Sequence, residues 1–127
     1  MIQKGSKLNV IDNSGARFVC CIHVPCGYRR RYAFIGDSII VSIKRLRNKR
    51  KFFSKVKKGE VIKALIVRTK NSLKSYSAEN LGFKENSVVL FNKQNKLIGT
   101  RLFGIIPLTF RYTKYLKLVS LAAGLAC

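Results

Sequence analysis

Acidic residues are scarce in this chain of 127 residues, which has five Asp and Glu against 26 Lys and Arg. The formal net charge is +21 at pH 7. A globule of this length has a radius of gyration of about 14 Å, so its unpaired cations repel one another until a polyanion joins them. The imbalance argues against a free-standing soluble enzyme and favours a place inside a nucleic-acid assembly.

Long apolar runs are also missing. A transmembrane helix needs about 20 apolar residues, and the longest candidates, Leu102–Phe110 and Leu118–Cys127, are much shorter. The first ten residues show neither an apolar signal core nor an Arg/Ser-rich transit pattern. We therefore expect no membrane partner, and a protein that works where it is made or has already lost a targeting segment.

The residues that catalysis needs are few and scattered. The one histidine, His23, lies within a strand-like segment and has no nearby serine or carboxylate to complete a triad. No glycine pattern matches a phosphate-cradling loop. We expect no enzyme activity, no cofactor and no small-molecule substrate.

The four cysteines, Cys20, Cys21, Cys26 and Cys127, raise the alternative of a zinc site. Zinc sites usually combine a C-x₂₋₄-C pair with a second pair further along the chain, and no second pair is present here. Adjacent strand residues also point to opposite faces, so Cys20 and Cys21 cannot both face one metal. We favour small buried thiols in a reducing compartment and expect no metal.

Hydrophobic residues make up 47% of the chain, and their spacing is mostly that of β-strands. In Ser38–Lys44, for example, Ile39, Val41 and Ile43 alternate with polar positions. The expected strands are Leu8–Val10, Phe18–Val24, Ser38–Lys44, Val61–Val67 and Ser87–Phe91. Turn signals separate these short segments, which predicts an all-β fold, a small closed five-stranded barrel.

Helical spacing occurs only near the end of the chain. We expect a C-terminal helical segment over about residues 105–127, with short helices at Thr109–Leu116 and Leu121–Ala126. No repeat or low-complexity linker interrupts the sequence, so residues 1–127 are expected to form one domain.

A loop between the third and fourth expected strands is the most basic part of the chain. Between residues 44 and 58 no acid relieves the charge, and Phe52 and Phe53 stand in the middle. A loop laid against phosphates, with its aromatic rings packed on ribose, base or a neighbouring protein, accounts for both features. Its basic residues are Lys44, Arg45, Arg47, Lys49, Arg50, Lys51, Lys55, Lys57 and Lys58.

A second basic cluster, Arg29, Arg30 and Arg31, follows a Pro/Gly turn and suits bidentate phosphate contact. A third exposed segment, expected to be the tip of a projecting hairpin, is indicated by Lys70, Lys74 and the serine-rich stretch Ser72–Ser77.

Five segments of the chain resemble the universal large-subunit ribosomal protein L-fourteen family. They are Leu8–Arg17, Arg30–Asp37, Lys55–Lys70, Ile98–Gly104 and Lys117–Ala122, in the family's order and over almost the whole chain. The resemblance implies a five-stranded barrel with a projecting ribbon and small C-terminal helices. It also implies binding to large-subunit rRNA, with Arg17, Arg68 and Lys70 added to the basic residues above.

Further partners follow only from this resemblance. They are neighbouring large-subunit proteins, small-subunit rRNA across the subunit interface, and the ribosome-silencing factor that blocks subunit joining. The factor's docking face would include Thr100, Arg101 and Lys117. The alternative is that Arg101 binds rRNA and Lys117 is merely solvated.

The sequence departs from the family pattern in three places. The basic segment Arg45–Ser54 is longer than the usual loop, and Phe83–Asn86 lacks a glycine that the family has there, which leaves the geometry of this turn open. An acidic residue expected in Leu108–Arg111 is replaced. With few acids and many Lys, Phe, Ile, Asn and Tyr residues, the composition resembles that of an organellar member of the family. We expect such a protein to be encoded and made in the organelle. We expect a mitochondrial ribosome first, then a plastid, then a bacterial cytoplasm.

A different class of function stays open from the sequence. A free cationic module, binding DNA or a membrane surface, would also be strongly basic. A membrane binder needs an amphipathic helix, however, and the basic residues here lie on expected β-loops.

Overall fold

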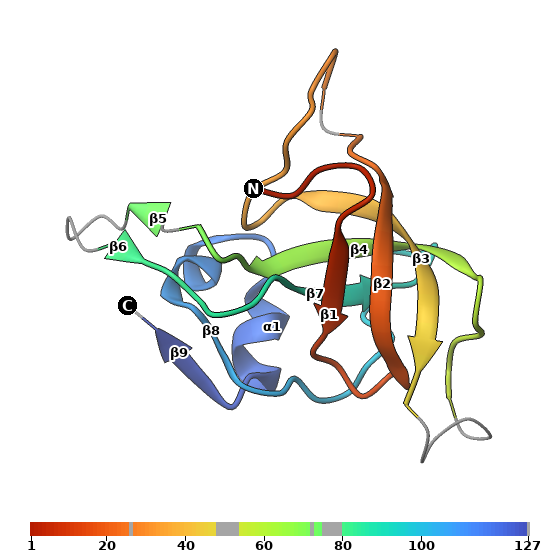
Figure 1. Ribbon diagram of the computed structural model, residues 1–127. Coiled ribbons are helices and arrows are strands. Elements are labelled where there is room, and N and C mark those ends of the chain that lie inside the picture. The colour runs from red at the N-terminus through yellow and green to blue at the C-terminus, as the bar shows by residue number, and fades with distance from the viewer. Residues whose placement is uncertain (26, 48–53, 72, 75–79, 127) are drawn as a thin grey trace.

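Five strands close into a barrel in the computed structural model, which describes residues 1–25, 27–47, 54–71, 73–74 and 80–126 (Figure 1). They are β1 (Lys7–Val10), β2 (Ala16–His23), β3 (Ser38–Leu46), β4 (Val61–Arg68) and β7 (Ser87–Phe91). Antiparallel pairs join β1–β2, β2–β3, β3–β4 and β4–β7, and a parallel pair between β7 and β1 closes the sheet. The predicted all-β, five-stranded barrel is confirmed.

Alternating side chains fill the barrel. On β3, Ile39, Val41 and Ile43 are fully buried while Lys44 points into solvent, as the sequence pattern predicts. They pack with inward residues of the other strands, such as Val19 of β2. Each aliphatic side chain removed from water contributes about 1.5–3 kcal/mol to this core.

Two strands are buried on both faces. Ala64 and Ile66 of β4 point into the barrel, whereas Leu65 and Val67 join a second apolar cluster on its outside. β7 is divided in the same way. A strand covered on both sides needs apolar residues at every position, which explains the nearly continuous apolar run of β4.

The second cluster is covered by the C-terminal segment, which lies against one side of the barrel (Figure 1). Its buried residues include Ile106, Phe110 and Leu118. The segment consists of β8 (Ile105–Pro107), a 3₁₀ helix η2 (Leu108–Tyr112), α1 (Leu116–Leu121) and β9 (Gly124–Ala126).

The expectation of helix at Leu121–Ala126 is wrong. α1 ends at Leu121, Ala122 is extended with ψ 149°, and β9 pairs in parallel with β8. Gly124 is a poor helix former, and here it lies opposite Ile105 in the strand pair. The expected helix at Thr109–Leu116 is realised only as η2 and the first residue of α1.

A small hairpin extends away from the barrel, at the left of Figure 1. It pairs β5 (Leu73–Lys74) with β6 (Asn80–Leu81), as predicted for a projecting ribbon. Ser72 and residues 75–79, between and beside these strands, are not among the described residues. No helix in the described ranges is long and apolar enough to span a membrane.

The turn after β1 is held by a buried carboxylate. Asp12 is fully buried, and its Oδ1 accepts hydrogen bonds from the backbone N–H and the hydroxyl of Ser14. Its Oδ2 accepts the backbone N–H of Leu90 in β7, at 3.0 Å. Burial raises the pKa of Asp12 above 3.8, although these hydrogen bonds oppose the shift. One side chain thus ties the turn to the strand that closes the barrel.

The same turn fixes both ends of the basic loop. The carbonyl of Ser14 accepts the N–H of Lys55, and that of Gly15 accepts the N–H of Arg47. Gly15 has φ +102°, and a Cβ there would lie 2.6 Å from Cβ of Ser54. Only glycine allows this approach.

We predict that Asp12→Asn lowers the free energy of unfolding by about 1–3 kcal/mol, because an amide NH₂ in place of Oδ2 leaves the buried N–H of Leu90 without an acceptor. Urea denaturation measures this. Ser14→Ala, which removes one donor and no acceptor of these bonds, should cost less. Equal stability of wild type and Asp12→Asn would contradict the role of Asp12.

The difference in stability between wild type and Asp12→Asn should also depend on pH. Because folding raises the pKa of Asp12, the stability that its titration contributes is fully present below pH 3.8. That stability is lost as the pH rises through the pKa of the folded state. Asp12→Asn has no such titration. The stability gap between the two proteins should therefore narrow as pH rises through that window.

Candidate nucleic-acid interface

A basic groove crosses the outside of β1, β2 and β3. It continues onto the segments that flank the small hairpin, at Lys70 and at residues 84–86. We call it the basic groove; its cations are Lys7, Lys44, Arg45, Lys70 and Lys84, all exposed. The ion pairs found within the described residues are Arg30–Asp37 and Arg68–Glu85, so none of the five groove cations has an ion-pair partner there.

Phe18 lies on this groove in a row of paired residues. The register places Asn9 of β1 opposite Phe18 of β2, and Phe18 opposite Arg45 of β3. The guanidinium of Arg17 lies 5.3 Å from the centroid of the Phe18 ring, within the range of a cation–π contact. The structure therefore places Phe18 in one groove with the predicted residues Lys44, Arg45 and Lys70, and Arg17 lies over its ring.

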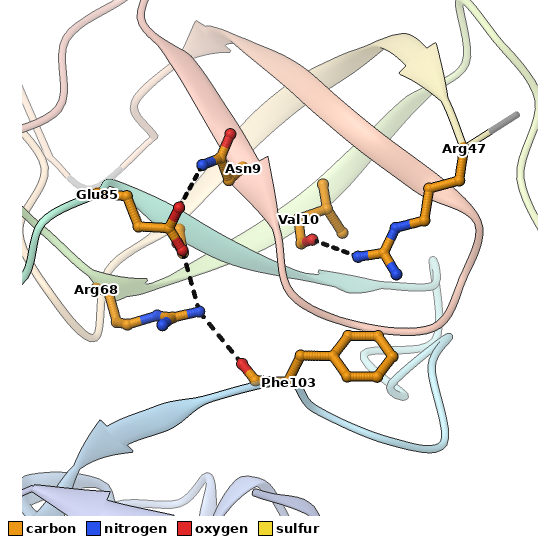
Figure 2. A network of polar contacts seen from close by, with 7 residues as sticks. Asn9, Val10, Arg47, Arg68, Glu85 and Phe103 are labelled. Atoms are coloured by element: carbon orange, nitrogen blue, oxygen red, sulfur yellow. Dashed lines mark hydrogen bonds and ion pairs between the residues drawn. The ribbon is translucent and has the colours of Figure 1, made fainter. Parts of the chain in front are cut away.

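One carboxylate, Glu85, lines the basic groove and is fully engaged (Figure 2). Its Oε2 accepts from Nδ2 of Asn9 at 2.6 Å, and its Oε1 accepts from the Ser87 hydroxyl and pairs with Arg68 at 3.3 Å. None of residues 83–86 has a positive φ, so the turn forms without the family's glycine. These contacts to Glu85 tie it to β1 and β4.

Two predicted RNA-binding arginines are used inside the protein. Arg68 donates to the carbonyl of Phe103 at 3.2 Å, and burial lowers its pKa against the opposing effect of Glu85 (Figure 2). Arg47 donates to the carbonyl of Val10 at 3.2 Å and stacks 5.0 Å from the Phe103 ring centroid. Both join the barrel to the segment before β8, so we leave them out of the proposed interface.

The arginine cluster lies at a second groove. Arg30 and Arg31 line it together with Lys4 and His23. Arg30 also pairs with Asp37 and donates to the carbonyl of Tyr32. Arg29 lies outside the lining, with φ +54° and its guanidinium 5.2 Å from the ring centroid of Tyr28.

The basic loop is described only at its ends. Lys55 donates to the carbonyl of Ile98, while Lys57 and Lys58 are exposed. The predicted sites at Lys49, Arg50 and Lys51, and the aromatic pair Phe52 and Phe53, fall outside the described ranges.

A third groove runs between the barrel and the C-terminal segment. Apolar side chains line it, among them Phe91 and Tyr115, whose rings meet edge to face at 5.9 Å. Its basic residues are Lys63, Lys96, Lys114 and Lys117. We call it the C-terminal groove. It brings together Thr100 and Lys117, whereas Arg101 is exposed beside Thr100 without lining the groove.

Asn13 holds the Thr100–Arg101 segment in place. Its Oδ1 accepts the backbone N–H groups of Thr100 and Arg101, and its Nδ2 donates to the Thr100 hydroxyl at 2.8 Å. Thr100 and Arg101 were predicted from the sequence, whereas the positioning role of Asn13, which is distant along the chain, was not.

A comparison with models of known protein families shows which family the chain belongs to. The model described as ribosomal protein L14p/L23e matches residues 1–126. The chain belongs to this family. It is therefore a structural protein of the large ribosomal subunit, with rRNA and ribosomal proteins as its partners, and not an enzyme. The assignment displaces the alternative of a free cationic module.

Sequence reasoning missed four residues that this L14p/L23e chain places on the basic groove: Lys7, Asn9, Phe18 and Lys84. Lys7 and Lys84 are isolated cations in the sequence, and only the barrel topology brings them together. Phe18 carried no signal of this kind, because Phe18–Ile22 is apolar at every position and only the structure shows which of these side chains face outward.

Metal ligands do not gather in the described part of the chain, where no three His, Cys, Asp or Glu side chains come together. Cys21 is buried and Cys20 half-buried, as expected for neighbours on a strand. The other two cysteines of the zinc alternative, Cys26 and Cys127, are not described.

We predict that Asn13→Ala speeds amide hydrogen exchange at Thr100 and Arg101, because both N–H groups lose their acceptor. Asn13→Asp is the matched control, since a carboxylate oxygen keeps both bonds. Unchanged exchange in Asn13→Ala would show that other contacts hold this segment.

Proposed function

We propose that residues 1–127 act as one rRNA-binding domain of the large subunit, with the basic groove as its main contact. The observation that carries this is the gathering of five exposed cations from four separate segments on one surface. Folding alone gives no reason to collect like charges, because they repel one another. A phosphate backbone along the groove supplies the missing counter-charge.

The acidic residues support this interpretation, because the described ones use their carboxylates in contacts within the protein. Asp12 is buried, Asp37 pairs with Arg30, and Glu85 pairs with Arg68. Glu60 accepts the backbone N–H of Lys57. The groove cations are left for an external partner.

We predict a steep salt dependence for binding of the purified chain to large-subunit rRNA. For about eight neutralised phosphates, log K should fall against log salt with a slope of about −6 to −7. Filter binding or fluorescence anisotropy across a salt series measures the slope. A nearly flat dependence would contradict the electrostatic account.

We further propose that the C-terminal groove is the docking face of the ribosome-silencing factor, and that the chain contributes to bridges with small-subunit rRNA. Thr100, Arg101 and Lys117 lie on or beside a groove with an apolar floor and a basic rim. That combination suits an acidic protein surface carrying apolar side chains.

We predict that Arg101→Glu with Lys117→Glu abolishes silencing-factor binding but leaves the protein in large subunits, because most of the proposed rRNA-facing charge lies elsewhere. Pull-down with the purified factor and sedimentation measure the two properties. Lys93→Glu with Arg111→Glu is the matched control, since it makes the same charge change at exposed residues outside the groove lining.

Two outcomes separate the alternatives. Wild-type factor binding by the Arg101/Lys117 variant would refute this docking face. Failure of that variant to enter the subunit, while the control variant enters, would instead assign Arg101 to rRNA.

We also propose that the host ribosome is mitochondrial. Support comes from the composition, which is poor in acids and rich in Lys, Ile, Phe, Asn and Tyr. Fractionation of cells into organelles, followed by sedimentation, tests this. Recovery with plastid or cytoplasmic large subunits would refute it.

A further inference from the structure

An aromatic ring and an arginine are turned outward together on β2. Regular alternation would send one of two successive side chains into the barrel. The pairing with β3 shifts register on both sides of Phe18, from Ala16↔Leu46 to Phe18↔Arg45 to Val19↔Ile43. This bulge keeps Ala16 and Val19 inside the barrel and leaves Arg17 exposed and Phe18 half-exposed.

Folding does not account for the position of Phe18. It belongs to neither apolar core, and it shares the basic groove with charged and amide side chains. A phenyl ring gains little from a solvent-filled groove lined by lysines. Its ring does pair with the Arg17 guanidinium, 5.3 Å away, so two flat groups meet at the edge of the groove.

Flat groups of this kind are what unpaired bases bind. RNA-binding proteins stack splayed-out bases on aromatic rings and on arginine planes, whereas bases inside an A-form duplex are stacked on one another. Around Phe18 the groove supplies the other two elements of a nucleotide site. Lys44, Arg45 and Lys70 can hold phosphates, and Asn9, which lies directly opposite Phe18 and donates its Nδ2 to Glu85, keeps its Oδ1 as an acceptor for a base edge.

We propose that the basic groove takes an unpaired rRNA nucleotide, with its base stacked on the Arg17–Phe18 pair and its phosphates on the groove cations. This inference rests on the proposed rRNA-binding function. It adds that the groove recognises single-stranded RNA rather than duplex, and that Phe18 supplies the discrimination.

The experiment compares full-length wild type, Phe18→Leu and Phe18→Tyr by fluorescence anisotropy at fixed salt. The probes are a labelled 12-nucleotide RNA of unstructured mixed sequence and a labelled 12-base-pair RNA duplex. Phe18→Leu should bind the single strand about tenfold more weakly, the lower part of the range for one lost stack because Leu keeps some apolar contact. Duplex affinity should not change, and Phe18→Tyr should bind as wild type does.

A salt series separates stacking from charge. Phe18→Leu should keep the wild-type slope of log K against log salt, because no phosphate contact is lost. Lys70→Gln should reduce the magnitude of the single-strand slope by about 0.7.

Phe103→Leu is the matched control, since Phe103 is also partly exposed and carries an arginine over its ring but does not line the groove. It should leave single-strand affinity unchanged. An equal loss of single-strand affinity in Phe18→Leu and Phe103→Leu would overturn the stacking site. An equal loss of affinity for the single strand and the duplex in Phe18→Leu would overturn it too. So would binding of a 12-residue polyglutamate peptide as tightly as the single strand with the same dependence on Phe18.

The stacking site and the proposed rRNA-binding function can be refuted separately. Salt-dependent RNA binding with Phe18→Leu equal to wild type on the single strand overturns only the stacking site. Absence of RNA binding by the wild type overturns the proposed function as well.

Discussion

The turn formed by residues 12–15 is the constraint on which the functional surfaces depend. Asp12 anchors it to β7, Asn13 holds Thr100 and Arg101, and the carbonyls of Ser14 and Gly15 hold the two ends of the basic loop. The proposed factor face and the most basic loop therefore share one support. Close packing leaves little room for change here, since a Cβ on Gly99 would lie 2.7 Å from Cβ of Asp12.

A chain so rich in cations must divide them between structure and binding. Arg47 and Arg68 pack against the barrel and join it to the segment before β8. Both donate hydrogen bonds to backbone carbonyls, and Arg68 also pairs with Glu85. The groove lysines have no such partners among the described residues. The same residue types thus serve two purposes, and the difference lies in which neighbours the topology provides.

The sequence could predict the barrel because its signals are local. Alternation on β3 and the two-sided apolar run of β4 follow directly from which faces are buried. β9 was missed because its extended backbone depends on parallel pairing with β8, which no local pattern reveals. The internal roles of Arg47 and Arg68 were missed for a similar reason, since residue type does not show what lies across the fold.

The candidate site was predictable only in part. Lys44, Arg45 and Lys70 stood out as members of dense basic segments, whereas Lys7 and Lys84 are isolated cations that only the barrel topology brings to the basic groove. Phe18 faces outward because of a bulge, which shifts the phase of alternation at one position.

Ultraviolet cross-linking of native large subunits, followed by mass spectrometry of the peptide–nucleotide adducts, tests the central claim most directly. The account predicts rRNA adducts on peptides that contain Phe18, Lys44 or Lys70. Adducts on other parts of this chain, with none on the basic groove, would contradict it.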